Sequence, residues 1–226
     1  EEFREAFDVG AEERVKIVNQ ELLSVVVPLH DESANLRELS DRIARALFEV
    51  ENLDFEILLV DDGSTDSSWD VIGQLNDEDP RIKGIRLSRN FGQQAALTAG
   101  LDYAGGDAIV TMDADLQHPP ELLGAMIDKW RSGFDVVSMV RAPSRNESWV
   151  KRRTSSFFYR LINALSETRI KNGVADFRLL DRRVVRRLNR MRERARFIRG
   201  MISWVGFRET EIHSKPASRF AGRSQY

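Results

Sequence analysis

Apolar runs and helical stripes alternate along the first 140 residues of this 226-residue chain. Largely apolar runs, typical of strands buried on both faces, fall at 22–29, 55–60, 107–112 and 134–140, and a more polar strand is expected at 82–87. Segments whose apolar residues recur every three or four positions, as on a helix face, fall at 36–50, 69–75, 93–103 and 121–130. Strands that alternate with helices predict a mostly parallel sheet with right-handed crossovers. The expected fold class is therefore α/β, a Rossmann-like sheet flanked by helices.

The alternation weakens after Arg141. A helical stripe of Phe and Leu spans 157–165, and a short extended piece follows at 207–213. Residues 1–20 carry charge around a few apolar positions and are interpreted as an N-terminal extension. The expected organisation is one catalytic domain over 21–226, with a ligand-binding half at 21–140 and a basic, helical half at 141–226.

Charge divides the chain at the same place. Residues 1–140 hold 12 Lys and Arg against 29 Asp and Glu, whereas 141–226 hold 22 against 7. Ten of these arginines lie between Arg178 and Arg199. Such a block favours an anionic partner, either a membrane surface or a phosphorylated acceptor. Nucleic acid is disfavoured because no nucleic-acid motif accompanies the charge, and a solvated helix face remains an alternative for Arg182–Arg196.

Composition and missing motifs exclude several classes. The chain has no Cys, so disulfides and thiolate chemistry are excluded. No apolar run approaches the roughly 18 residues of a membrane span, and we expect no secretory leader. Neither G-x-G-x-x-G nor G-x-x-x-x-G-K-[ST] occurs, which argues against a dinucleotide oxidoreductase and a P-loop NTPase.

An acidic motif at the end of one predicted strand is the most informative feature. Asp113-Ala-Asp115-Leu-Gln117-His-Pro-Pro-Glu follows the run 107–112, and its prolines suit the first turn of a helix. Open α/β sheets bind ligands at such strand-to-helix turns. In extended geometry both carboxylates point to one side, followed by the Gln117 amide. These hard oxygen ligands predict Mg²⁺ or Mn²⁺ holding substrate phosphates, although a bare Asp-x-Asp is more often a plain polar turn.

Polar residues also follow the first two predicted strands. Pro28-Leu-His-Asp-Glu32 ends one, and Asp61-Asp62-Gly-Ser64 ends the other. Their carboxylates can accept hydrogen bonds from ribose hydroxyls or a base N–H, while Ser64 or Thr65 capping the next helix is an equal alternative. Three strand ends at one sheet edge suit a nucleotide whose diphosphate is bridged by a metal.

These motifs together resemble the family-2 glycosyltransferases with the GT-A fold. The resemblance rests on SVVVPLHDE, LLVDDGSTD, RNFGQQAAL, MDADLQHPPE and DFRLLDRR, in family order from about Leu22 to Tyr226. MDADLQHPPE together with Arg219-Phe-Ala-Gly-x-Ser224 is similar to the polyprenyl-phosphate glycosyltransferases, relatives of dolichyl-phosphate mannose synthase and bacterial undecaprenyl-phosphate glucosyltransferases. These enzymes move a sugar from a nucleotide diphosphate to a lipid-linked phosphate with inversion.

The resemblance implies a role for each matching residue. The nucleoside pocket would comprise Pro28, His30, Glu32, Val60 and Asp62. The diphosphate would lie along Asp113, Ala114 and Asp115, with Asp113, Asp115 and Gln117 on the metal. Phosphates would be held by Arg141, Arg219 and Arg152, and Asp176 would be an active-site acid. Three positions depart from the family pattern: His30 stands where relatives often carry Tyr, and Arg223 and Gln225 are unusual, which weakens phosphate contact by residue 225.

The function that the resemblance implies is transfer of a hexose to a polyprenyl phosphate at the cytoplasmic face of the cell membrane. UDP-glucose is the first expected donor, with GDP-mannose and other UDP-sugars open; a homo-oligomer is open too. Bacterial relatives continue into transmembrane helices beyond the position of Tyr226, so the chain is expected to be the catalytic portion of a membrane protein. Two alternatives remain: a glycosyltransferase acting on a saccharide or protein, and a non-catalytic sugar-nucleotide-binding domain.

Overall fold

The computed structural model describes residues 20–141, 174–191, 193 and 196–214. The elements, in chain order, are β1 (Glu21–Leu29), α1 (Ser33–Phe48), β2 (Leu53–Asp61), α2 (Ser68–Glu78), β3 (Ile82–Arg86), α3 (Gln93–Tyr103), β4 (Ala108–Thr111), the 3-10 turn η1 (Pro120–Leu122), α4 (Leu123–Arg131), β5 (Val136–Arg141), β6 (Val174–Asp181), α6 (Arg182–Arg190), α7 (Ile198–Trp204) and β7 (Glu209–Ser214). The predicted extension at 1–20, apart from Gln20, and the stripe at 157–165 lie outside these residues.

Seven strands form one sheet in the order β3-β2-β1-β4-β6-β5-β7. Each described pair of neighbours is parallel except for those made by β6, which runs antiparallel to both β4 and β5. The predicted α/β class with a mostly parallel sheet is therefore confirmed. At the far edge β5 and β7 pair in register, so that Arg141 lies opposite Ser214.

The prediction that the basic half is helical was incomplete. Residues 174–181 form β6, which inserts into the sheet beside β4. No strand was predicted there because Asp176 and Arg178 interrupt the apolar run. Phe177 and Leu179 point to one face of the sheet and are fully buried, which is the two-residue period of a strand.

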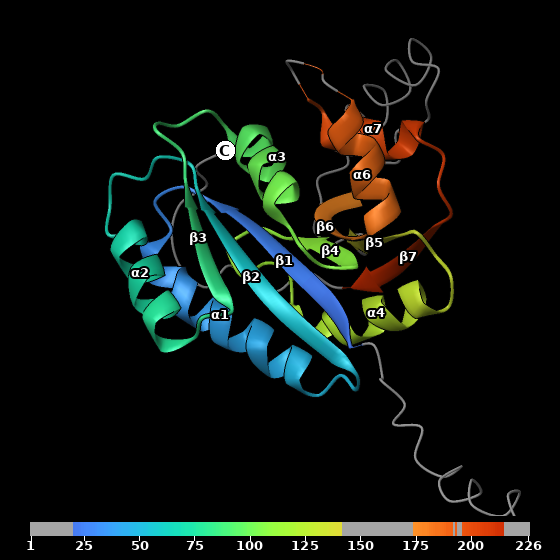
Figure 1. The fold of residues 1–226 in the computed structure, drawn as a ribbon, viewed down its shortest axis with the longest axis horizontal. Helices are drawn as coiled ribbons and strands as arrows, with labels where there is room; N and C mark the ends of the chain where they lie inside the picture. The colour runs from blue at the N-terminus through green and yellow to red at the C-terminus, as the bar shows by residue number, and fades with distance from the viewer. Residues whose placement is uncertain (1–19, 142–173, 192, 194–195, 215–226) are drawn as a thin grey trace, which may run out of the picture.

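Helices cover both faces of the sheet (Figure 1): α1, α2 and α4 lie on one side, and α3, α6 and α7 on the other. Successive residues of β1 serve the two layers, with Val25 and Val27 packing toward α1 and Val26 toward α3. A Cβ at Gly100 of α3 would overlap the Val26 side chain, so glycine lets this helix lie close to the sheet. Burial on both faces explains why the central strands β1, β2 and β4 are largely apolar.

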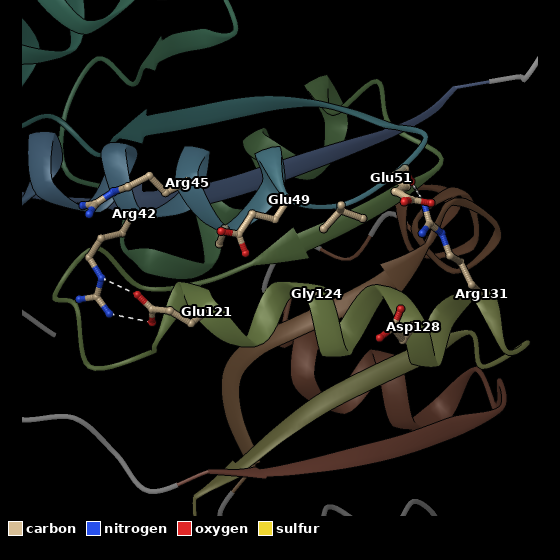
Figure 2. A pocket seen from close by; sticks show the side chains of 10 residues that line it. Arg42, Arg45, Glu49, Glu51, Glu121, Gly124, Asp128 and Arg131 are labelled. Carbon is tan, nitrogen blue, oxygen red and sulfur yellow. Dashed lines mark hydrogen bonds and ion pairs between the residues drawn. The ribbon is translucent and has the colours of Figure 1, made fainter.

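Ion pairs fasten α4 to α1 and to the start of the sheet. Arg42 of α1 makes a two-pronged contact with Glu121 at 2.9 and 2.8 Å, and Arg131 of α4 contacts both Glu21 (2.8 Å) and the Glu51 carbonyl (2.9 Å). Figure 2 shows two of these contacts at opposite ends of a groove of about 600 Å³ between the helices. Its lining carries both signs of charge, and no residue predicted for ligand binding lines it.

A buried carboxylate organises the loop between α3 and β4. Glu56 of β2 is 6% exposed and accepts hydrogen bonds from the Ser24 hydroxyl (2.6 Å), the Gly105 amide (2.7 Å) and the Lys83 ammonium (2.7 Å). Burial by itself raises the pKa of the Glu56 carboxyl, but the hydrogen bonds and the Lys83 charge outweigh it and lower the pKa overall. The ionised form is therefore the one that stabilises the fold.

Replacement of this carboxylate tests that network. We expect Glu56→Gln to lower the free energy of unfolding by about 1–3 kcal/mol at neutral pH, because a buried partner loses its acceptor. A carboxyl whose pKa is lower in the folded protein stabilises it above the unfolded pKa, and this contribution fades as pH falls through the folded value. The difference in urea unfolding between parent and variant should therefore begin to shrink below about pH 4 and disappear below the folded pKa. The exposed Glu49→Gln is the control; a constant difference at every pH would contradict the account.

Candidate functional site

The carboxyl ends of β1, β2 and β4 lie at one edge of the sheet. The three strands are parallel neighbours in the order β2-β1-β4, and they end at Leu29, Asp61 and Thr111. The predicted convergence of three strand ends is therefore confirmed. This edge is where open α/β sheets bind ligands.

The loops after β1 and β2 are bonded to each other. The Asp31 carboxylate accepts from the Thr65 amide at 2.7 Å, and the Ser64 hydroxyl accepts from the Asp31 amide at 2.9 Å. Asp31 adopts a left-handed φ of 53°, a conformation that aspartate tolerates better than most residues. The alternative that Ser64 or Thr65 caps α2 is wrong, since the N-cap position is Ser67.

The predicted nucleoside residues lie on and beneath these loops. His30 Nδ1 lies 2.9 Å from the Asp62 backbone carbonyl oxygen, to which it must donate. The Glu32 carboxylate accepts from the side-chain amide of Asn35 at 2.6 Å. The structure buries Pro28 and Val60, the latter in the core under α3. Only His30 and Glu32 of these four have side chains that reach the surface of the edge.

Asp62 is fully buried and fixes the start of α3. Its two carboxylate oxygens accept from the backbone amides of Phe91 and Gly92, each at 2.8 Å. A Cβ on Gly63 would overlap the backbone of Arg89, so glycine allows the 89–92 loop to approach this closely. Asp62 thus has a clear structural task, and its contact with a nucleoside stays a prediction.

The Asp113–Gln117 motif forms a turn, and the extended geometry expected for it is wrong. β4 already ends at Thr111, and residues 114 and 115 are in a turn. Leu116 adopts a left-handed φ of 60° while its side chain is 1% exposed. The Asp115 carboxylate accepts a hydrogen bond from the backbone N–H of Gln117 at 3.0 Å. A non-glycine residue in this conformation is strained by about 1–3 kcal/mol, and burial of the Leu116 side chain holds it in place.

Two neighbours orient the Asp113 carboxylate. Gln93, the first residue of α3, donates to Asp113 Oδ1 at 2.7 Å. The buried His118 ring lies 3.7 Å from Asp113 Oδ2 and stacks on Phe177 of β6. No role was predicted for Gln93 or His118, although both lie in the motifs RNFGQQAAL and MDADLQHPPE. Their position beside Asp113 depends on packing between distant segments, which no local pattern reveals.

β6 brings a second charged cluster to the same edge. The Thr111 hydroxyl donates to the Asp176 carbonyl at 2.8 Å, and the Asp176 carboxylate pairs with Arg199 of α7 at 2.8 Å. Arg178 is 4% exposed, and desolvation lowers its pKa to about 10, despite the opposing charge of Asp176. Arg178 therefore remains charged at neutral pH. Arg178 and Arg199 had been included only in the general basic block.

The donor set of the Asp113 turn suits a hard cation. Asp113, Asp115 and Gln117 offer carboxylate and amide oxygens at half-buried positions, which matches Mg²⁺ or Mn²⁺. No group of three His, Cys, Asp or Glu that would hold a metal by itself occurs in the described part of the chain. An ion here would need further oxygens from substrate phosphate or water, as is common for Mg²⁺.

The predicted phosphate-binding arginines are only partly placed. Arg141 ends β5, at the same edge as the Asp113 turn, and nothing is described of its side chain. Arg152 and Arg219 lie outside the described residues.

Comparison with known proteins decides the family. The family model described as "Glycosyl transferase family 2" matches residues 24–188. The chain belongs to this family. It is 42% identical to an uncharacterised glycosyltransferase, YkcC, of Bacillus subtilis (strain 168), and 36% identical to the bactoprenol glucosyl transferase of Shigella phage SfV. Each match covers 90% of this chain but 62% and 66% of the relative, so the chain spans less than two thirds of their length.

Solved structures share the fold of this family-2 chain. A mannosyltransferase from Pyrobaculum calidifontis, in complex with GDP-Man and Mn²⁺, superposes with a TM-score of 0.62 at 21% identity and covers 90% of this chain and 58% of its own. Glucosyl-3-phosphoglycerate synthase from Mycobacterium tuberculosis, with Mn²⁺ and UDP-glucose, gives 0.56 at 17% identity over 91% and 73% of the two chains. At these identities the likeness shows the fold, a GT-A-like mixed α/β sheet flanked by helices.

The task of Asp62 can be measured. We expect Asp62→Asn to lower the free energy of unfolding by about 1–3 kcal/mol, because one of the two amides then faces an N–H₂ group. Amide hydrogen exchange at Phe91 and Gly92 should accelerate more than exchange in β2. The control is Asp70→Asn, an exposed position in α2; equal protection at 91 and 92 in parent and variant would refute this account.

Proposed function

We propose that this chain is the catalytic domain of an inverting glycosyltransferase that moves a hexose from a nucleotide diphosphate to a polyprenyl phosphate. The observation that carries the proposal is the Asp113–Gln117 turn at the carboxyl ends of β1, β2 and β4, oriented by Gln93. Relatives named bactoprenol glucosyl transferase match nine tenths of the chain. UDP-glucose is the first candidate donor, and GDP-mannose is the second.

The donor would lie across the three strand ends. His30, Glu32 and Asp62 would meet the nucleoside, with Pro28 and Val60 as the buried support. Asp113, Ala114 and Asp115 would line the diphosphate, and Asp113, Asp115 and Gln117 would hold Mg²⁺ or Mn²⁺. The bound ion would neutralise charge on the departing diphosphate.

The acceptor chemistry explains why the site needs no strong base. A phosphate monoester is already anionic near neutral pH, so alignment and charge neutralisation suffice. Asp176, whose carbonyl accepts from Thr111 at the end of β4, is ion-paired with Arg199, which suits an organising role. Arg141, Arg219 and Arg152 would hold the donor or the acceptor phosphate.

Two other functions differ in ways that can be measured. Transfer to a saccharide or protein hydroxyl would require a base at the acceptor, and it gives no reason for the basic C-terminal third. A non-catalytic sugar-nucleotide-binding domain would leave the donor intact, whereas the proposed enzyme should slowly hydrolyse it with Mn²⁺. A panel of nucleotide sugars with a short polyprenyl phosphate separates the candidates.

We further propose that the basic half faces the cytoplasmic surface of the membrane. Arg186, Arg187 and Arg190 are exposed on α6, and Trp204 at the end of α7 is 62% exposed. Among the described residues, no helix is long and apolar enough to cross a membrane. Exposed cations and an exposed tryptophan on neighbouring helices are typical of surfaces that meet lipid headgroups.

The metal assignment predicts that Asp115→Asn abolishes transfer and removes the Mn²⁺-dependent strengthening of UDP or GDP binding, while the fold survives because Asp115 lies on a surface turn. Titration calorimetry with and without Mn²⁺ measures the effect. Asp128→Asn, at an exposed position of α4, should behave like the parent. Unchanged metal-dependent binding in Asp115→Asn would exclude the assignment.

The membrane assignment predicts that the parent sediments with vesicles containing anionic lipid and not with neutral ones. Each basic residue near the surface should contribute about 1 kcal/mol, and binding should fade with added salt. Neutralising Arg186, Arg187 and Arg190 to Gln should release the protein while leaving transfer to a short acceptor nearly intact.

The matched control neutralises three exposed cations on the opposite helical layer, Arg37, Arg45 and Lys129. This variant should bind anionic vesicles as the parent does. Equal sedimentation of the parent with both lipids, or with neither, would show that the basic half does not face a membrane.

A further inference from the structure

A groove of about 640 Å³ lies on the α3 side of the sheet, between α3 and the segment that leads into α7. The described residues that line it from the two sides are Phe91, Gln94, Ala95, Thr98, Arg196 and Phe197, with the exposed Glu193 on the same segment as Arg196. None of these residues belongs to the donor site described above. Grooves of this size accommodate small organic ligands.

The α3 side of the groove is less polar than its sequence suggests. The Thr98 hydroxyl donates to the Gln94 carbonyl at 2.8 Å, which leaves its methyl group to the surface. The Gln94 side-chain oxygen accepts from the Ile198 amide at 3.1 Å and so ties α3 to the start of α7. Together with Ala95, these residues provide a largely apolar wall.

Two aromatic rings flank the groove, and both are half exposed. Phe91 and Phe197 are each 49% exposed, although large apolar side chains are usually buried. A Cβ on Gly200 would lie 2.6 Å from the Phe197 ring, so glycine lets that ring pack against α7. Arg89 stacks over the Phe91 ring at 4.1 Å. The rings are held in place while about half of their surface remains accessible.

The groove is also lined by a cationic side chain, that of Arg196, with an N–H donor that has no acceptor among the described residues. Arg196 Nη1 is buried and has no hydrogen-bond partner among the described residues. A buried guanidinium N–H without an acceptor is costly, and an anionic group would satisfy it. With Arg89 on the Phe91 ring, the cations favour an anion over a neutral ligand despite Glu193 nearby.

The groove adjoins the transfer site through consecutive residues. Gln93 contacts Asp113, while Gln94 lines the groove. On the other wall, Arg199 pairs with Asp176 and stands three residues after Arg196 in the sequence. A ligand in the groove would therefore have one end near the donor site.

We propose that this groove binds the acceptor, with its first isoprene units between Phe91 and Phe197 and its phosphate end near Arg196. The inference rests on the proposed function and adds to it the site of the hydrocarbon chain. Apolar walls joined to a cation match an anionic lipid, whereas a saccharide would need hydrogen-bonding groups along the walls.

The test measures transfer by the full chain to two polyprenyl phosphates of different length in detergent. We expect Phe91→Ser combined with Phe197→Ser to raise KM for the long acceptor about tenfold, since lost apolar contact of this size corresponds to a factor of that order. KM for the donor and for a short acceptor of about two isoprene units, which has little chain to bury, should change little. Arg196→Gln should raise KM for both acceptors by a similar factor, because both carry the phosphate.

Two further variants guard against an effect on folding. Tyr103→Ser removes another exposed aromatic residue from α3, outside the groove, and should behave as the parent. Gly200→Ala favours the helix while displacing the Phe197 ring, and it should raise KM for the long acceptor without lowering thermal stability.

Three results would overturn the assignment. Unchanged dependence of KM on acceptor length in the double Phe variant would show that the chain binds elsewhere. The same result with loss of binding to vesicles containing anionic lipid would show that the rings meet a bilayer instead. A parent that hydrolyses donor but transfers to neither acceptor would refute the proposed function itself, and the groove assignment with it.

Discussion

The Asp62 carboxylate makes the contact on which the rest of the candidate site depends. It receives the amides of Phe91 and Gly92 and thereby sets where α3 begins. From that start the next two side chains diverge, Gln93 to Asp113 and Gln94 to the first residue of α7. One buried acid therefore fixes the geometry of a donor-side carboxylate and of the opposite wall of a groove. Its burial is tolerated because both oxygens are hydrogen-bonded.

The antiparallel strand β6 is the second organising feature. In a purely parallel sheet the strand beside β4 would present its carboxyl end at this edge. Because β6 runs the other way, it presents its amino end there and places Asp176 and Arg178 beside Thr111. Asp176 and Arg178 of the C-terminal half thus lie at the same edge as the acidic residues of the N-terminal half. The acidic and the basic halves of the sequence therefore contribute oppositely charged side chains to the same edge of the sheet.

The sequence predicts part of this arrangement for physical reasons. Strands covered on both faces are largely apolar, so β1, β2 and β4 were recognisable as runs, and their ends located the acids. β6 escaped notice because Asp176 and Arg178 break its run. The turn at Leu116 escaped it too, because a left-handed leucine is stabilised only by its burial in the folded core. Gln93 and His118 lie in recognised motifs, but they orient Asp113 through contacts between segments that are far apart in the sequence.

The register between β5 and β7 has a consequence for the parts of the chain that carry Arg152 and Arg219. The part that carries Arg152 follows Arg141 and ends at Val174, the start of β6, which pairs with β5. The part that carries Arg219 follows Ser214, and Ser214 is the register partner of Arg141. Both segments are thus anchored on adjacent strands at the edge that holds the Asp113 turn. Arg152 stands 11 residues after Arg141, and Arg219 stands five residues after Ser214. Two arginines far apart in sequence are therefore each joined by a short stretch of chain to the edge that holds the Asp113 turn.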